Sequence, residues 1–98
     1  MKLQMIGCSH HHSTVAVRER LAFNPAQVGV AIDRLRGQVP ETEVVLLSTC
    51  NRVEIYVAGS AAAELPTFSQ IAKFQSEFHQ VPQDDFVGEL RELNGTAG

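Results

Sequence analysis

The order of apolar segments in this 98-residue chain predicts an α+β fold built as β-α-β-β-α-β. Two observations carry this prediction. Short, β-prone apolar runs occur in four places, and two longer segments have apolar residues at helical spacing. In this order the strands form an antiparallel sheet with two helices on one face, which is the ferredoxin-like arrangement. The length suits one domain with a modest core.

The strands are predicted from runs rich in Val, Ile and Leu that are bounded by polar residues. We place them at Leu3–Cys8, Glu43–Thr49, Arg52–Ala58 and Phe86–Leu93. For the last of these, a short helix is the alternative. The tail, Asn94–Gly98, has the composition expected at the start of a linker.

The clearer of the two helices is predicted to begin after Asn24, which can cap it. Pro25 suits the first helical position and Gln27 completes a capping box. An apolar stripe at i, i+3, i+4 and i+7 follows, formed by Val28, Ala31, Ile32 and Leu35. Gly37 is expected to end the helix in a left-handed conformation.

The second helix is expected from about Pro66 to His79, and its broad apolar face includes three phenylalanines. The helix dipole at its C-terminus would favour His79. In contrast, Val15–Phe23 mixes apolar and charged residues. We expect an irregular segment or one short helical turn there.

Composition excludes several classes of protein. The formal net charge of −3 leaves no electrostatic footprint for a nucleic-acid backbone. The apolar runs are far too short to span a bilayer, and the N-terminus does not resemble a signal peptide. We therefore expect a cytoplasmic protein without membrane contact, whose two cysteines are free thiols.

The most unusual segment is the turn Ser48–Arg52 between the second and third strands. Hairpin turns often depend on glycine, whereas this one carries two hydroxyls, a thiol, an amide and a guanidinium, a set that we expect to suit a turn poorly. Cys50 is therefore a candidate nucleophile. The alternative is a small, buried residue at a strand end. Arg52 could favour the thiolate or bind a carboxylate of a substrate.

The predicted topology brings Ser9 and His10 to this turn, because the first and second strands are parallel with the third between them. His10 is therefore a candidate site residue, whereas His11 and His12 suit an exposed loop. Cys8 and the histidines could instead bind a metal. Adjacent residues in an extended segment point to opposite sides, however, so we expect no metal site.

Two charged pairs have more than one interpretation. Glu54 shares a strand face with Arg52, so the two form either a surface ion pair or part of a site. Arg18 and Glu19 are either a solvated charge cluster or a structural support for the His10 loop.

Ser48–Tyr56, with the sequence STCNRVEIY, resembles the STCNR(T/V)E-aliphatic-Y signature of the glutamyl-tRNA reductase family. Ile6–His10 and the later Val17-Arg18-Glu19 are similar to that family's N-terminal motif. FQSEFHQVPQDDF resembles the helix and loop that follow in the family. The resemblance covers essentially the whole chain.

The resemblance implies that residues 1–98 are the family's ferredoxin-like, N-terminal catalytic domain. It implies that Cys50 attacks the ester joining glutamate to its tRNA, which gives a thioester. NADPH then reduces the thioester to glutamate-1-semialdehyde, the first step of tetrapyrrole (haem and porphyrin) biosynthesis by the five-carbon route. Arg52 is implied in recognising the glutamyl group. Four further residues match other positions of the family's glutamyl pocket or its support: Ser48, Thr49, Glu54 and His10.

The same resemblance implies glutamyl-tRNA as a partner, a homodimer and transfer of the product to glutamate-1-semialdehyde aminomutase. The chain has no GxGxxG, so NADPH would be bound by a domain that it lacks. The dimerisation domain and a downstream histidine would lie beyond the chain as well. The family's proline after the histidine is also missing, since His11-His12-Ser13-Thr14 stand there.

We therefore expect a domain that carries the nucleophile and the glutamyl pocket but cannot complete the reduction alone. The alternative function is a non-catalytic, ferredoxin-like ligand-binding or regulatory module.

Overall fold

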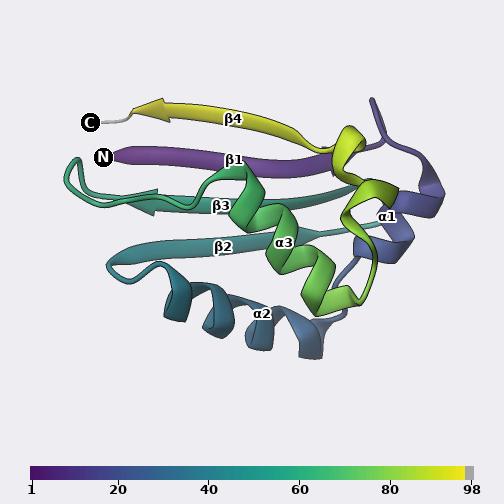
Figure 1. Ribbon diagram of the computed structural model, residues 1–98, viewed down its shortest axis with the longest axis horizontal. Helices are drawn as coiled ribbons and strands as arrows, with labels where there is room; N and C mark the ends of the chain where they lie inside the picture. The colour runs from purple at the N-terminus through teal and green to yellow at the C-terminus, as the bar shows by residue number, and fades with distance from the viewer. Residues whose placement is uncertain (97–98) are drawn as a thin grey trace.

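The computed structural model describes residues 1–96, which form a four-stranded sheet with its helices on one face (Figure 1). The strands are β1 (Lys2–Ser9), β2 (Thr42–Ser48), β3 (Arg52–Gly59) and β4 (Arg91–Thr96). Their order is β2-β3-β1-β4, and every neighbouring pair is antiparallel. The predicted α+β class is confirmed, with the third strand between the first two. The ferredoxin-like assignment itself stays a prediction.

Three helices lie between the strands: α1 (Val15–Leu21), α2 (Pro25–Gln38) and α3 (Phe68–His79). Capping boxes start α2, as predicted from Asn24 and Gln27, and also α3, from Thr67 and Gln70. Such boxes satisfy backbone N–H groups that have no partner within the helix. The expected starting point near Pro66 is therefore close to the observed one.

Two predictions about helices are wrong. The segment expected to be irregular or one short helical turn forms α1, a helix of seven residues, and the Thr14 hydroxyl caps it by accepting a hydrogen bond from Val17 N. Gly37 does not end α2; the helix continues to Gln38 and is followed by Val39. The observed left-handed C-cap belongs instead to Gln80, after α3, with φ 56°.

The end of the chain also differs from expectation. In place of a strand at 86–93, two short 3-10 helices, η1 (Gln83–Asp85) and η2 (Val87–Glu89), precede β4. They place Phe86 and Leu90 in the core, at 2% and 4% exposure, before the pairing of β4 with β1 begins at Arg91. Asn94 and Gly95, expected in a linker, pair with β1. Residues 97–98 lie outside the described residues.

All three helices contribute to one core on the same face of the sheet. Alternate residues of a strand point to opposite faces, and the inward set is apolar. Helix and strand residues in this core include Ile6, Val53, Ile55, Leu21, Leu35, Ile71 and Phe74. The opposite face of the sheet is left without a covering layer, as antiparallel sheets allow.

One end of the molecule collects the polar segments. β1 and β2 both finish at the right-hand end of Figure 1, where α1 lies, whereas the chain termini lie at the left. The loop after β1 and the β2–β3 turn are thus neighbours, as the topology predicted. None of the helices within residues 1–96 is long and apolar enough to cross a membrane.

Candidate functional site

The β2–β3 turn is built without glycine and without backbone strain. Thr49 N donates to Arg52 O at 2.8 Å, and the Thr49 hydroxyl accepts from the N–H groups of Asn51 and Arg52, both at 3.2 Å. Among the described non-glycine residues, only Glu41 and Gln80 have positive φ. The expectation that these residues suit a turn poorly is therefore wrong, because the side chain of Thr49 closes it.

Two other segments donate hydrogen bonds to backbone carbonyl groups of this turn, those of Cys50 and Asn51. His10 N, just after β1, donates to Asn51 O at 2.8 Å. From α1, Arg18 Nε donates to Cys50 O at 3.3 Å. The loop after β1, the turn and α1 are therefore joined directly at one end of the sheet.

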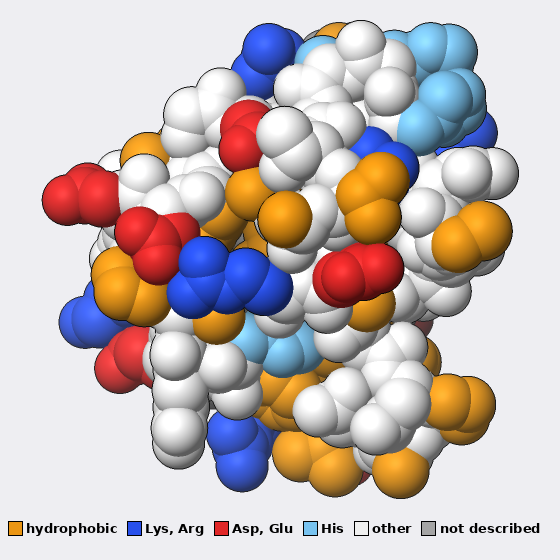
Figure 2. Space-filling model, turned by 90° about the vertical axis from the view of Figure 1, so that its right-hand side faces the viewer, with side chains coloured by type: hydrophobic (Ala, Val, Ile, Leu, Met, Phe, Trp, Pro, Cys, Tyr) orange, Lys and Arg blue, Asp and Glu red, His pale blue; other side chains and the backbone are white. Residues whose placement is uncertain are grey.

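A pocket of about 330 Å³ lies between α1 and the turn. Figure 2 shows this end of the molecule, where several histidine side chains gather at one corner. The lining of the pocket combines the turn with one side of α1 and the start of the next connection: Val15, Arg18, Glu19, Ala22, Phe23, Ser48, Thr49 and Cys50.

The two cysteines have opposite environments. Cys50 is exposed on the turn, whereas Cys8 is 1% exposed inside the core. Burial raises the pKa of the Cys8 thiol, and a hydrogen bond with Ser13 and the nearby charge of Arg18 oppose this only in part. Cys50 is therefore the accessible thiol, and the alternative that it is a small, buried residue at a strand end is wrong. Cys8, near the end of β1, is the cysteine with that environment.

Ser48 and Thr49 are close to Cys50 but already have structural partners. The Ser48 hydroxyl accepts a hydrogen bond from Phe23 N at 2.9 Å, which fixes the connection between α1 and α2 against β2. The Thr49 hydroxyl accepts from the turn itself. Each hydroxyl retains its own proton as a donor.

Arg52 and Glu54 lie on the other side of the sheet. Val53 points into the core. Its neighbours in β3, Arg52 and Glu54, therefore point to the uncovered face, because successive residues of a strand point to opposite faces. Their side chains form an ion pair at 3.6 Å, as their spacing predicted. Tyr56 Oη donates to Glu54 Oε1 at 2.9 Å. Burial, and then this bond to a carboxylate, raise the pKa of Tyr56.

The histidines do not line the pocket beside Cys50. His10 and His11 are exposed, and their rings lie 4.0 Å apart between centroids. His12 is partly buried, and desolvation, together with the charge of Arg91, lowers its pKa. Within residues 1–96, no group of three or more His, Cys, Asp or Glu side chains is arranged to hold a metal.

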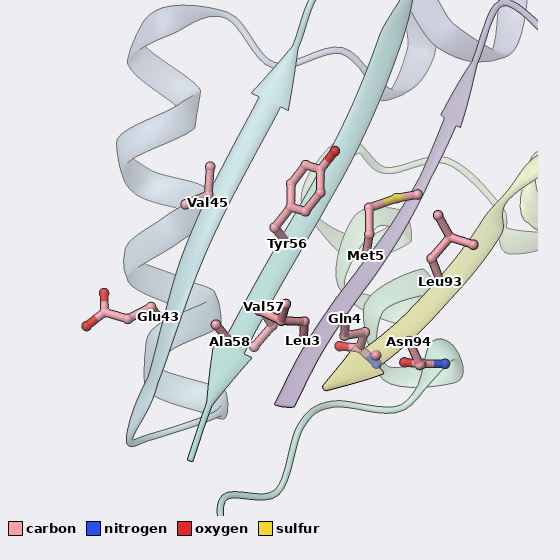
Figure 3. Close-up of a pocket in the computed structure, with 11 residues that line it drawn as sticks. Leu3, Gln4, Met5, Glu43, Val45, Tyr56, Val57, Ala58, Leu93 and Asn94 are labelled. Carbon is pink, nitrogen blue, oxygen red and sulfur yellow. The ribbon is translucent and has the colours of Figure 1, made fainter. Parts of the chain in front are cut away.

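A second hollow, of about 370 Å³, lies on the uncovered face of the sheet (Figure 3). Val45, Tyr56, Met5 and Leu93 form a row across it, one from each strand, because they are paired in register. Its lining is almost wholly apolar, and it contains no residue of the turn.

The sequence did not identify the α1 residues of the Cys50 pocket as a group. Val17 and Leu21, both buried and spaced by four, are the signal that could have found α1. On a helix, Arg18 then falls at the edge of this apolar stripe, and Glu19 falls on the side away from it. Their place beside Cys50 depends on how α1 packs.

The chain is similar to known proteins over most of its length. Residues 6–97 match the family described as "Glutamyl-tRNAGlu reductase, N-terminal domain". A glutamyl-tRNA reductase of Rhodopirellula baltica is 48% identical over 65 residues, which are 66% of this chain and 15% of the relative. Those of Synechococcus elongatus and Colwellia psychrerythraea are 42% and 33% identical, covering 93% and 92% of this chain.

The chain spans only 19% and 21% of the length of the last two relatives, so it corresponds to a small part of each. The match to the family nevertheless covers nearly all of this sequence, including the turn that bears Cys50. The chain therefore belongs to the glutamyl-tRNA reductase family and corresponds to its N-terminal domain.

Proposed function

We propose that this chain supplies the nucleophile and part of the glutamyl pocket of a glutamyl-tRNA reductase, with Cys50 as the catalytic residue. The observation that carries the proposal is the position of Cys50. It is the exposed thiol of the two, it lies on a turn, and it lines a pocket between that turn and α1. A thiol in this setting is open to a large acyl substrate.

The step proposed for this chain is an acyl transfer. Sγ of Cys50, as the thiolate, attacks the carbonyl carbon of the glutamyl ester, and the bond between that carbon and the tRNA ribose oxygen breaks. The ribose oxygen that leaves takes up the proton that the thiol gave up, and so becomes a hydroxyl. The product is a thioester, which accepts hydride more readily than an oxygen ester and divides the reduction into two easier steps.

The remaining site residues are proposed in two groups. Ser48 and Thr49 border the pocket, hold the turn and can each donate one hydroxyl proton to the substrate. Arg52, Glu54 and His10 are proposed contacts on the other side of the turn. The Arg52 side chain is 44% exposed, so its guanidinium can reach a carboxylate despite its ion pair with Glu54.

The described residues do not fit NADPH. Their sheet pairs only antiparallel neighbours, and the sequence has no glycine-rich turn between a strand and a helix. We propose that NADPH, the hydride donor, binds to a part of the full-length protein outside this chain, and we assign no part of the hydride transfer to residues 1–98. Dimerisation, transfer of glutamate-1-semialdehyde to its aminomutase and a cytoplasmic location belong to the same proposal.

The test is the transfer of labelled glutamate from glutamyl-tRNA to the protein. We expect wild type to acquire acid-stable label that hydroxylamine releases, as a thioester requires. Cys50→Ser and Cys50→Ala should acquire none, whereas Cys8→Ser, the matched control, should retain it if it folds. Hydroxylamine-sensitive label on Cys50→Ala would refute the proposal.

A non-catalytic binding module is the competing function, and the apolar hollow on the uncovered face is the observation that favours it. That function predicts no transfer of label to wild type. It also predicts that the three cysteine variants behave alike, because neither thiol borders the hollow.

A further inference from the structure

We propose that Arg18 is the positioning residue of this site: it fixes the turn that carries Cys50 relative to α1 and to the loop after β1. This inference rests on the proposed function of Cys50 and names a residue that acts through it.

Arg18 is a buried cation whose partners are not carboxylates. Its exposure is only 8%. Within residues 1–96, the ion pairs are Arg20–Asp85 and Arg52–Glu54, so no carboxylate neutralises Arg18. A charge taken from water without a counter-charge is costly, and an apolar side chain would pack there more favourably. Its presence therefore indicates a role beyond filling space.

The hydrogen bonds of Arg18 show what that role is. Nε donates to Cys50 O at 3.3 Å, and Nη1 donates to Ser13 O at 2.6 Å and to Ser13 Oγ at 3.2 Å. Because the guanidinium is planar and rigid, one side chain sets the position of the turn and the loop relative to each other. A lysine ammonium has no fixed fork and would not do this equally well.

The contact with Cys50 O complements the contact made by His10. Asn51 O accepts from His10 N, so the two carbonyl groups that follow the thiol are held by different segments. Without Arg18, the turn loses one of these two anchors, the one on the carbonyl group of Cys50 itself. The direction of the Cys50 side chain into the pocket would then vary.

The helix that presents Arg18 is itself anchored at its start, where Thr14 N donates to Glu89 Oε1 at 2.6 Å. Glu89 comes from the segment before β4, so the start of α1 is held between that segment and the turn. Arg20 also pairs with Asp85 of that segment at 3.2 Å, but these side chains are 47% and 44% exposed, so the pair contributes little to the position of α1.

The consequence for the reaction is orientation. A displacement of about 1 Å in a reacting group can slow a reaction on the order of 100-fold. Arg18 is not assigned contact with the reacting atoms. We therefore expect its loss to slow acyl transfer without blocking access to the thiol.

The test compares Arg18→Met and Arg18→Lys with Arg20→Met, a matched control two residues away on the same helix. We expect Arg18→Met to slow single-turnover transfer of glutamate to Cys50 at least tenfold, with the half-saturating concentration of glutamyl-tRNA within about twofold of wild type. Arg18→Lys should recover only part of the rate. Arg20→Met should transfer at close to the wild-type rate.

Two further measurements separate positioning from damage to the fold. The rate at which iodoacetamide alkylates Cys50 should change less than about threefold in Arg18→Met, because the thiol is already exposed. Cys8 should stay protected, since it reacts only when the core opens. Amide hydrogen exchange should accelerate at Thr49–Arg52 and remain unchanged in the paired strands.

A wild-type transfer rate in Arg18→Met would overturn the proposal, as would a lost rate accompanied by alkylation of Cys8. Amide hydrogen exchange tests the positioning role of Arg18 separately from the acyl-transfer reaction. Unchanged exchange at Thr49–Arg52 overturns the positioning role. If wild type acquires no label but exchange in the turn accelerates in Arg18→Met, the structural role of Arg18 is supported and only the proposed function fails.

Discussion

At the scale of single residues, neighbouring groups decide which ionisable side chain can change charge. His79 lies at the end of α3, where a helix dipole favours a positive ring. Its ring, however, packs 4.4 Å from that of Phe23 and 5.1 Å from that of Phe78, between centroids. Burial lowers the pKa of His79, opposed by a hydrogen bond to the backbone of Leu21. Desolvation thus outweighs the dipole, contrary to the prediction from sequence.

This gives a prediction for stability against pH. A histidine whose pKa is lower in the folded than in the unfolded state binds fewer protons when folded, so stability rises with pH in that window. The free energy of unfolding should therefore fall as the pH drops below the ordinary value of 6.5, until the pH reaches the folded pKa. His79→Phe should reduce this fall by up to about 1 kcal/mol, since the ring is only partly buried.

Urea unfolding at about pH 7 and about pH 5 measures the effect. His11→Phe serves as the control, because His11 is an exposed residue of the loop after β1. Parallel losses of stability in wild type and His79→Phe would show that other groups cause the pH dependence.

At the scale of elements, the sequence predicts those boundaries of strands and helices that a local pattern of residues marks. Strand boundaries at β1, β2 and β3 agree with prediction within one residue at each end, because alternating or continuous apolar runs mark them. The start of α2 is equally well marked by its capping box. α1 was missed because its apolar stripe is short and charged residues occupy its middle. Phe86 and Leu90 suggested a strand, whereas they are core residues presented by 3-10 turns.

The candidate site was also predictable only in the parts that local sequence determines. The signature identified Cys50 on a turn, and strand alternation could have placed Ser48 and Arg52 on opposite faces of the sheet. The bond from Arg18 to Cys50 O could not be predicted, because the two residues are 32 positions apart and meet only when α1 packs.

The pairing of β1 with β3 requires a glycine at one position. A Cβ on Gly7 would overlap Val53 O and lie 2.7 Å from Glu54 Cα. Both contacts are backbone atoms of the neighbouring strand and cannot move away easily. We expect Gly7→Ala to destabilise the protein by about 1–3 kcal/mol, as overpacking does.

Gly29 in α2 is the matched control, since a Cβ there meets nothing within 4 Å. Gly29→Ala should stabilise the protein by about 0.5–1 kcal/mol, because alanine favours the helix. Urea midpoints of both variants measure the contrast. Equal midpoints for Gly7→Ala and wild type would show that the strands separate without cost.

At the scale of the whole molecule, both faces of the sheet carry apolar residues, but helices cover only one face. The helix side forms the core, and the other side exposes the row of Val45, Tyr56, Met5 and Leu93 (Figure 3). Val45 is 60% exposed and Leu93 is 66% exposed. Isolated apolar residues at a surface are ordinary, whereas a contiguous apolar patch binds other apolar surfaces.

We therefore expect the folded protein to bind the dye ANS on this face. The double variant Val45→Gln, Leu93→Gln should lower ANS fluorescence severalfold while changing the unfolding free energy by less than about 0.5 kcal/mol per site, because both side chains are exposed. Glutamine is used because it is neutral and adds no charge that attracts the anionic dye. Val30→Gln, at a 46% exposed position on α2, is the control and should leave the fluorescence unchanged. If the double variant binds the dye as wild type does, the dye is bound elsewhere, and the row is too open to hold an apolar ligand.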